Sequence, residues 1–269
     1  MKFNVDHDYH IHSNISFCAA DDKELTKERI LKYAKDNNFT EICITDHLWD
    51  SDVPGASSWY QGQNYEHIAA ILPLPTAEGI SFSFGCETEL DKFMTVGLAS
   101  DKIDRFDFII IPTTHLHMNG FTVDESKTTV EDRAEVWAER LDKLLDMDLP
   151  WHKIGIAHLT CSLIAYNRSD FDEHIRILDT ISDETYIKLF EKLRDKGAGF
   201  ELNFAIERYN DEQLKRVLRP YKIAKEVGCK FYLGSDSHSV RELEAARIRF
   251  EKIVDALDLT DADRFRFGK

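Results

Sequence analysis

The sequence predicts an α/β protein folded as a parallel barrel of the (β/α) type. Three observations lead to this prediction: seven short apolar runs, helical segments between them, and polar side chains where the runs end. Strands that alternate with helices pair in parallel, and such barrels build their sites at the carboxyl ends of the strands. Because the sequence contains no linker, we expect residues 1–269 to form a single domain.

The first predicted strand covers residues 5–13, which mix β-favouring residues with His10 and His12. Two positions apart on an extended chain, both imidazoles point to the same side, which suits one metal ion. Residues 25–38 have the apolar spacing of a helix and end at two asparagines, and residues 41–45 form the second strand.

Residues 48–64 are rich in aromatic side chains, glycine and proline, so we expect a loop that forms a lid or a substrate wall. Two apolar runs, residues 80–84 and 108–111, are the third and fourth strands. A helix follows, with apolar residues three and four apart and Thr129 as its N-cap. Residues 153–157 are the fifth strand.

The last third of the chain repeats the alternation of helix and strand. We expect a helix over about 183–196, a strand over 199–203, another helix, a strand over 229–233 and a closing helix over about 240–257. Gly197 stops the first of these helices. Pro220 is expected to restart the middle helix at a first-turn position.

Composition limits the function. A net charge of −15 argues against general binding of polyanions, so long nucleic acid is not an expected partner. The chain has no apolar run of about 18 residues and no signal-peptide core, so we expect a cytoplasmic protein without a membrane span. Five scattered cysteines predict neither a disulfide framework nor a zinc knuckle.

Side chains of the types that bind metals follow the predicted strands. A second pair two residues apart, Asp236 and His238, follows the last strand just as His10 and His12 belong to the first. The complete set is His10, His12, His47, Glu87, His115, His158, Asp236 and His238. Imidazole and carboxylate ligands suit zinc, manganese or iron, and eight ligands exceed what one ion can use while keeping room for water. We therefore expect two or three divalent ions.

Seven short motifs resemble, in order and spacing, those of the polymerase and histidinol phosphatase (PHP) family. They are residues 8–13, 45–47, 85–87, 114–115, 157–158, 201–203 and 234–238. The resemblance runs from residue 8 to about 240. It implies a distorted, TIM-like (β/α)7 barrel, a cluster of two or three ions and phosphoester hydrolysis, with the eight residues above as metal ligands.

One segment departs from that family, which commonly has a further His or Asp ligand shortly after the opening His-x-His. Here the segment contains Cys18, Asp21 and Asp22. Cys18 is nearest the expected position, and a thiolate can bind zinc, but a plain buried thiol is the alternative. The third ion depends on this position.

The expected reaction is hydrolysis of a phosphomonoester by a metal-activated water. A third ion, or a protonated His238 or Asp46, would assist the leaving alkoxide. Asp8 and Asp46 are candidate acceptors that fix imidazole tautomers, with turn capping as the alternative. For the substrate phosphate the candidates are Arg208, which is the best placed, Arg168 and Arg241.

The resemblance also suggests a substrate. Length and layout resemble the histidinol-phosphate phosphatases of the family, so a small phosphorylated metabolite is the expected partner and L-histidinol phosphate the leading substrate. The alternatives are a nucleotide phosphatase or exonuclease-type phosphoesterase, and a metal-loaded binding module without catalysis. A carbon–nitrogen hydrolase would show a bridging lysine at a strand end, and none is placed for that. Tyr9, Trp49, Trp59 and Tyr60 are candidate pocket walls.

Overall fold

The computed structural model describes residues 1–268 and forms a nearly closed barrel of parallel strands. In sheet order the strands are β1 (His7–Ile11), β2 (Glu41–Ile44), β4 (Ser81–Thr88), β5 (Phe108–Pro112), β6 (Ile154–Ala157), β7 (Gly199–Leu202) and β8 (Lys230–Leu233). A two-residue strand, β3 (His47–Leu48), continues the line of β2 and pairs with β4. The predicted seven-stranded (β/α) barrel is therefore confirmed.

The last strand returns to the first and nearly closes the sheet. Just past β8, the Asp236 N–H donates to the His10 carbonyl at 2.7 Å, and the His12 N–H donates to the Ser237 carbonyl at 3.3 Å. These bonds bring together the two ligand-bearing pairs, which lie at opposite ends of the sequence. Closure of the barrel therefore creates the site.

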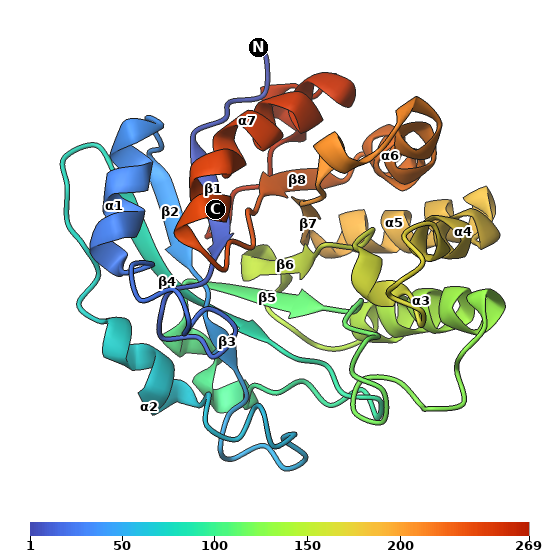
Figure 1. Ribbon diagram of the computed structural model, residues 1–269, viewed down its shortest axis with the longest axis horizontal. Coiled ribbons are helices and arrows are strands. Elements are labelled where there is room, and N and C mark those ends of the chain that lie inside the picture. Colours follow the sequence, from blue (N-terminus) through green and yellow to red (C-terminus); the bar gives the residue numbers. More distant parts are fainter. Residues whose placement is uncertain (269) are drawn as a thin grey trace.

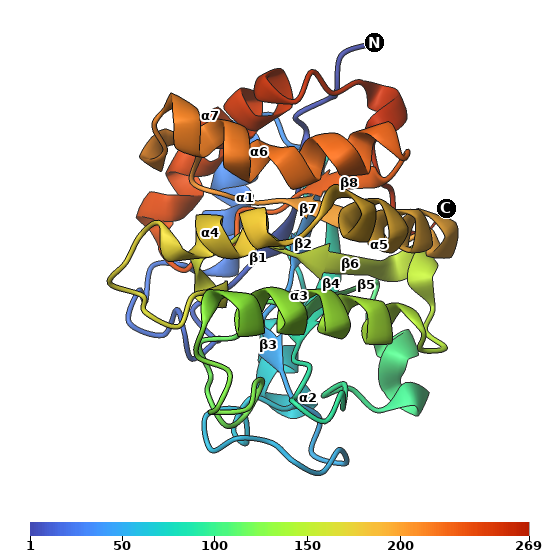
Figure 2. The ribbon, with the colours of Figure 1, turned by 90° about the vertical axis from the view of Figure 1, so that its right-hand side faces the viewer.

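Helices surround the strands (Figure 1). They are α1 (Lys27–Asp36), α2 (Tyr65–Ile68), α3 (Val130–Leu145), α4 (Glu173–Thr180), α5 (Asp183–Lys196), α6 (Asp211–Glu226) and α7 (Val240–Ala256). In the view turned by 90°, α3, α4, α5 and α6 cross in front of the strands (Figure 2). Thr129 caps α3 in a capping box with Asp132, and Gly197 ends α5 with φ +76°, both as predicted.

Alternate side chains along the strands face two different cores. On β5, Phe108 and Ile110 belong to a small cluster that also contains Tyr9 and Tyr232. Ile109 and Ile111 belong to the large cluster shared with the helices. This alternation is the pattern expected when one set of side chains fills the barrel and the other packs outward.

Three local features differ from the prediction. Pro220 lies inside α6 and does not restart a helix, because the helix already begins at Asp211, where the N-cap Asn210 forms a capping box with Gln213. The short helices α2 and α4 lack a long apolar period and were not predicted. Strand β4 runs on to Thr88, which places Glu87 inside the strand because β3 and β5 pair with it on both sides.

The loop predicted over residues 48–64 is confirmed except at its first residue: Leu48 belongs to β3, and residues 49–64 contain neither helix nor strand. Within residues 1–268, none of the helices combines the length and the apolar character needed to cross a bilayer.

Candidate metal centre

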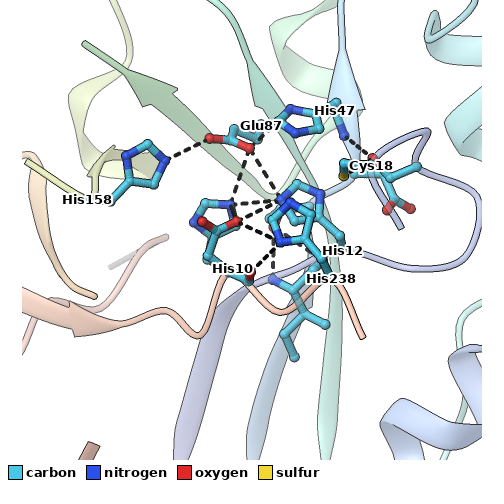
Figure 3. Close-up of polar contacts among 12 residues, drawn as sticks. His10, His12, Cys18, His47, Glu87, His158 and His238 are labelled. Atoms are coloured by element: carbon cyan, nitrogen blue, oxygen red, sulfur yellow. Dashed lines mark hydrogen bonds and ion pairs between the residues drawn. The ribbon is translucent and has the colours of Figure 1, made fainter. Parts of the chain in front are cut away.

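The eight predicted ligand residues meet at the carboxyl end of the barrel. His10 lies in β1 and His12 just after it, His47 in β3 and Glu87 in β4. His115, His158, Asp236 and His238 lie in the loops after β5, β6 and β8. In Figure 3, Glu87 lies between His158 on one side and His47 on the other, with His10 and His12 beside it. All except Asp236 and His238 are buried.

Their donor atoms form three groups, within each of which all ligand atoms lie within 4.8 Å of one another. Group A is His10, His12, Glu87 and Asp236; group B is Glu87, His115 and His158; group C is His12, Cys18, His47 and His238. Glu87 belongs to two groups and faces them with different oxygens. Its Oε1 lies 3.2 Å from His158 Nε2, whereas its Oε2 lies 3.3 Å from His12 Nε2 and 3.1 Å from His47 Nδ1.

The geometry of group A fits cations. Within residues 1–268 Glu87 Oε2 is buried and accepts no hydrogen bond of good geometry, although three imidazoles surround it. His10 Nε2 and His12 Nε2 face each other at 3.3 Å, and Asp236 Oδ1 lies 3.0 Å from His12 Nε2. Two ring nitrogens and two carboxylate oxygens converge here, and one of these oxygens, Glu87 Oε2, is left without a hydrogen bond, which is the arrangement expected of metal ligands.

Three of the imidazoles, His10, His115 and His158, are held by a partner on the side of the ring that faces away from the centre. His10 Nδ1 lies 2.6 Å from Glu201 Oε1, and His115 Nδ1 lies 2.7 Å from Glu89 Oε2. His158 Nδ1 lies 2.9 Å from Thr114 Oγ1. Because these partners occupy Nδ1, each ring presents Nε2 to the centre, which is how proteins fix metal-binding histidines.

Glu201 and Glu89 were not predicted as orienting acceptors, although the sequence held a signal for Glu89. Glu89 stands two residues after Glu87, so an extended chain puts both carboxylates on the same side. Glu201 stands inside one of the motifs that carry the family resemblance. Its second oxygen, Oε2, accepts from the His158 N–H at 2.7 Å.

Of the two interpretations of Asp8 and Asp46, the structure supports turn capping and not the orienting of imidazoles. Asp46 accepts from the Ser13 N–H at 2.6 Å and from the Ser13 hydroxyl at 2.7 Å. Asp8 accepts from the Ser235 N–H at 2.9 Å and the Tyr33 hydroxyl at 3.0 Å. Both carboxylates hold the loops that follow β1 and β8, because those turns leave buried backbone donors that need acceptors. Asp46 is thereby engaged away from the position of a proton donor.

The carboxylates and imidazoles of the centre shift the pKa values of one another. Burial raises the pKa of Glu87, but His47 and His10 more than offset this and hold it well below its usual range. Burial lowers the pKa of His10, but Glu201, Asp236 and Glu87 raise it to about 10. Protons on the imidazoles thus supply positive charge that bound metal ions would replace.

Of the three candidates for the additional ligand, Cys18 joins the cluster. Asp21 is exposed. Asp22 accepts from the N–H of Glu24 at 3.1 Å and of Val240 at 2.8 Å, so it caps two chain segments. Burial raises the pKa of the Cys18 thiol, but His12 and His47 lower it to about 3.

Two cavities open beside the centre. The first, of about 460 Å³, has the metal-ligand candidates Glu87, His115 and His238 in its lining. Its other walls are largely apolar and include Trp59, Tyr60, Met118, Phe121 and Leu163. Trp59 and Tyr60 are thus pocket walls as predicted, whereas Tyr9 and Trp49 are buried in the core. His117, whose pKa is lowered to about 3 by burial and by His115, also lines this cavity.

The second cavity, of about 350 Å³, is more polar and shares Leu163, Asp236 and His238 with the first. Arg208 lines it and stacks its guanidinium over Phe171 at 5.1 Å. Arg168 and Arg241 are exposed and are absent from the described lining of both cavities.

Arg249 of α7 lines the second cavity and was not predicted, because it lies in a helix far in sequence from any strand end. One of its terminal nitrogens lies 3.1 Å from Glu207 Oε1. Its buried Nε has no hydrogen-bond partner within the described chain.

A parallel barrel with three groups of largely buried donors at its carboxyl end defines a class: a barrel protein with a candidate multinuclear metal centre. The chain belongs to the PHP domain family, whose model matches residues 8–251. This match confirms the resemblance carried by the seven motifs.

Among solved structures, the chain is similar to histidinol phosphate phosphatase from Lactococcus lactis subsp. lactis Il1403, complexed with zinc, L-histidinol and phosphate. The TM-score is 0.58 at 17% identity, and the match covers 97% of this chain and 98% of that one. A chain of archaeal ribonuclease P with mature tRNA matches with a TM-score of only 0.36 at 14% identity, covering 87% and 88%. The first likeness shows the fold, and the second is too low in TM-score to support a conclusion. A search of curated proteins found no match.

Proposed function

We propose that the protein is a metal-dependent phosphatase of small phosphomonoesters, with L-histidinol phosphate as the leading substrate. The observation that carries the proposal is the set of three donor groups linked through Glu87 and His12 beside a cavity of about 460 Å³. Groups A and B would hold two divalent ions, zinc, manganese or iron, and group C a third. Bound ions would lower the pKa of a water molecule and neutralise charge on phosphoryl oxygens.

The chain's own residues divide the remaining work. Glu87 joins groups A and B, while Glu201 and Glu89 hold the imidazoles in place. His238 lies where the two cavities meet and is partly exposed, so it can reach a leaving oxygen. We assign it the proton-donor role when group C carries no ion. Asp46 does not take this role, because both of its oxygens accept hydrogen bonds from Ser13.

Arginine would supply the remaining contacts to phosphate. Arg208 and Arg249 line the polar cavity, which reaches the metal centre through Asp236 and His238. A guanidinium offers paired N–H donors that match phosphate oxygens. We therefore place the phosphate between the metal groups and these arginines, and the organic part of the substrate in the first cavity.

The choice of L-histidinol phosphate has two supports. The structural neighbour from Lactococcus lactis carries L-histidinol and phosphate, and the two chains cover each other almost completely. The first cavity has an aromatic wall that includes Trp59, Tyr60 and Phe121, which suits a planar ring such as imidazole.

The test is phosphate release from a panel that contains L-histidinol phosphate, nucleotides and other small phosphomonoesters, after reconstitution with zinc, manganese or iron. The proposal predicts strong release from L-histidinol phosphate that His10→Ala abolishes. Preference for a nucleotide would change the proposed substrate but not the proposed reaction. No release from any compound, with metal bound, would overturn the phosphatase proposal and favour a non-catalytic binding module.

A further inference from the structure

Group C differs from the other two groups in its chemistry. Groups A and B each combine imidazoles with the carboxylate of Glu87, and group A adds Asp236. Group C has three imidazoles and the thiol of Cys18, with no carboxylate among its members. A cation held there would therefore meet nitrogen and sulfur donors only, apart from ligands supplied by solvent or substrate.

Three separate parts of the chain build this group. Cys18 comes from the loop after β1, His47 from β3 and His238 from the loop after β8. The rings of His12 and His238 lie 4.5 Å apart, as do those of His12 and His47. The fold thus assembles one sulfur and several imidazole rings around a common point, which chance proximity along the sequence cannot explain.

Cys18 differs from the three buried cysteines in its exposure, and from Cys161 in belonging to a donor group. Cys43, Cys86 and Cys229 are fully buried. Cys18 is partly exposed and lines the first cavity together with His47 and His238. A cation in group C would therefore keep a side open to the cavity, as catalytic zinc sites do.

We propose that group C is a zinc-selective position with the Cys18 thiolate as a ligand, whereas groups A and B accept manganese or iron as well as zinc. Thiolate and imidazole donors favour zinc, while manganese prefers oxygen donors. On binding, the S–H proton is released to solvent and sulfur donates its electron pair to the metal. This inference rests on the metal centre of the proposed function, and it makes His238 a ligand whenever zinc fills group C.

The first test uses cobalt as a coloured substitute for zinc. A cobalt-loaded chain should show the near-ultraviolet charge-transfer absorption of a cobalt–thiolate bond. Cys18→Ser should abolish this band, while Cys161→Ser should keep it. Cys161 is the matched control, because it is also partly exposed and lines the neighbouring cavity but belongs to none of the three groups. A fully loaded wild-type chain without the band, or a band that survives in Cys18→Ser, would overturn the proposal.

The second test measures selectivity. Metal-free chain is given zinc with a large excess of manganese, and bound metals are counted by mass spectrometry. Wild type should retain about one zinc ion per chain, and Cys18→Asp should shift that position to manganese. Equal zinc-to-manganese ratios in the two proteins, with circular dichroism showing both folded, would contradict zinc selection by sulfur.

A third measurement needs no substitution. Zinc should protect Cys18 of the wild-type chain from alkylation at least tenfold, whereas manganese should not; equal protection would count against the proposal. All three readouts are independent of turnover. If no phosphate is released but the cobalt–thiolate band appears, the proposed reaction is wrong and the zinc position is supported. If phosphate is released but the band is absent, only the zinc position is wrong.

Discussion

Glu201 in β7 holds His10 in β1 through a contact of 2.6 Å between Oε1 and Nδ1, although 191 positions separate the two residues in the sequence. The other oxygen of Glu201 accepts from the backbone N–H of His158. One buried carboxylate therefore orients residues of two candidate metal-binding groups. Because Glu201 has these two acceptor roles, its replacement should disturb both His10 and His158.

Glu201→Gln should weaken metal binding about 10- to 100-fold. A glutamine has only one acceptor oxygen, so it cannot serve both the His10 ring and the His158 N–H that the two oxygens of Glu201 serve now. Competition with a chelator of known affinity measures the effect. Glu191→Gln, an exposed glutamate of α5, is the control and should bind metal like wild type. Equal affinities for both variants would show that Glu201 does not position His10.

Gly234→Ala should disturb the same contact from another direction. An added methyl group would overlap Glu201 Oε1 and lie 2.7 Å from the Cβ of His10. Overpacking of this kind costs about 1 to 3 kcal/mol in the free energy of unfolding, and metal affinity should fall with it. Gly79→Ala, with open space around the added methyl but φ +74°, should lose some stability and keep its metal affinity. Normal metal affinity in Gly234→Ala would show that metal binding does not depend on the contact between Glu201 and His10.

Arg208→Ala should lower kcat/KM for a phosphomonoester about 10- to 100-fold, because a charged hydrogen bond to phosphate contributes about 1.5 to 3 kcal/mol. Arg249→Ala should act in the same direction. Arg168→Ala and Arg241→Ala remove exposed side chains outside the described cavity linings and should change kcat/KM by less than about twofold. Steady-state kinetics on all four variants decide the matter. A loss of kcat/KM confined to Arg168→Ala or Arg241→Ala would show that phosphate binds near that residue and not near Arg208.

His7 should make the fold sensitive to acid. Its Nε2 accepts from the Leu233 N–H at 3.1 Å, and its Nδ1 lies 3.2 Å from Asp6 Oδ1. Burial lowers the pKa of His7 to about 4, although the hydrogen bond with Asp6 raises it. The unfolded chain therefore binds more protons between pH 6.5 and 4, and stability must fall as pH falls through this window.

The contribution of His7 between pH 7 and pH 5 is about 2 kcal/mol. Urea unfolding of the metal-free chain at both pH values should show that His7→Gln loses about that much less than wild type on acidification. His152→Gln, at an exposed histidine, should keep the wild-type slope. Parallel slopes for wild type and His7→Gln would refute the assignment.

The sequence predicts the barrel, and it picks out the eight donor residues that the structure brings together, because both depend on local patterns. Apolar runs of strand length alternate with helical periods, and polar donors follow the runs. The orienting shell was harder to predict because it depends on which strands become neighbours. Glu201 meets His10 only after the sheet closes, and Arg249 reaches the second cavity only because α7 packs against the turn at Ile206–Arg208. The prediction that Pro220 restarts a helix was wrong because an N-cap ten residues earlier, Asn210, determines where the helix begins.

The most direct test of the account follows phosphate release from L-histidinol phosphate as metal is returned to the chelated chain, in wild type and in Glu87→Gln. Glu87 belongs to both group A and group B, so its replacement should remove coupled binding of two ions. We predict no release without metal, release that rises as at least two ions bind, and a loss of about a hundredfold or more in Glu87→Gln. Release that survives chelation, or that is unchanged in Glu87→Gln, would contradict the account.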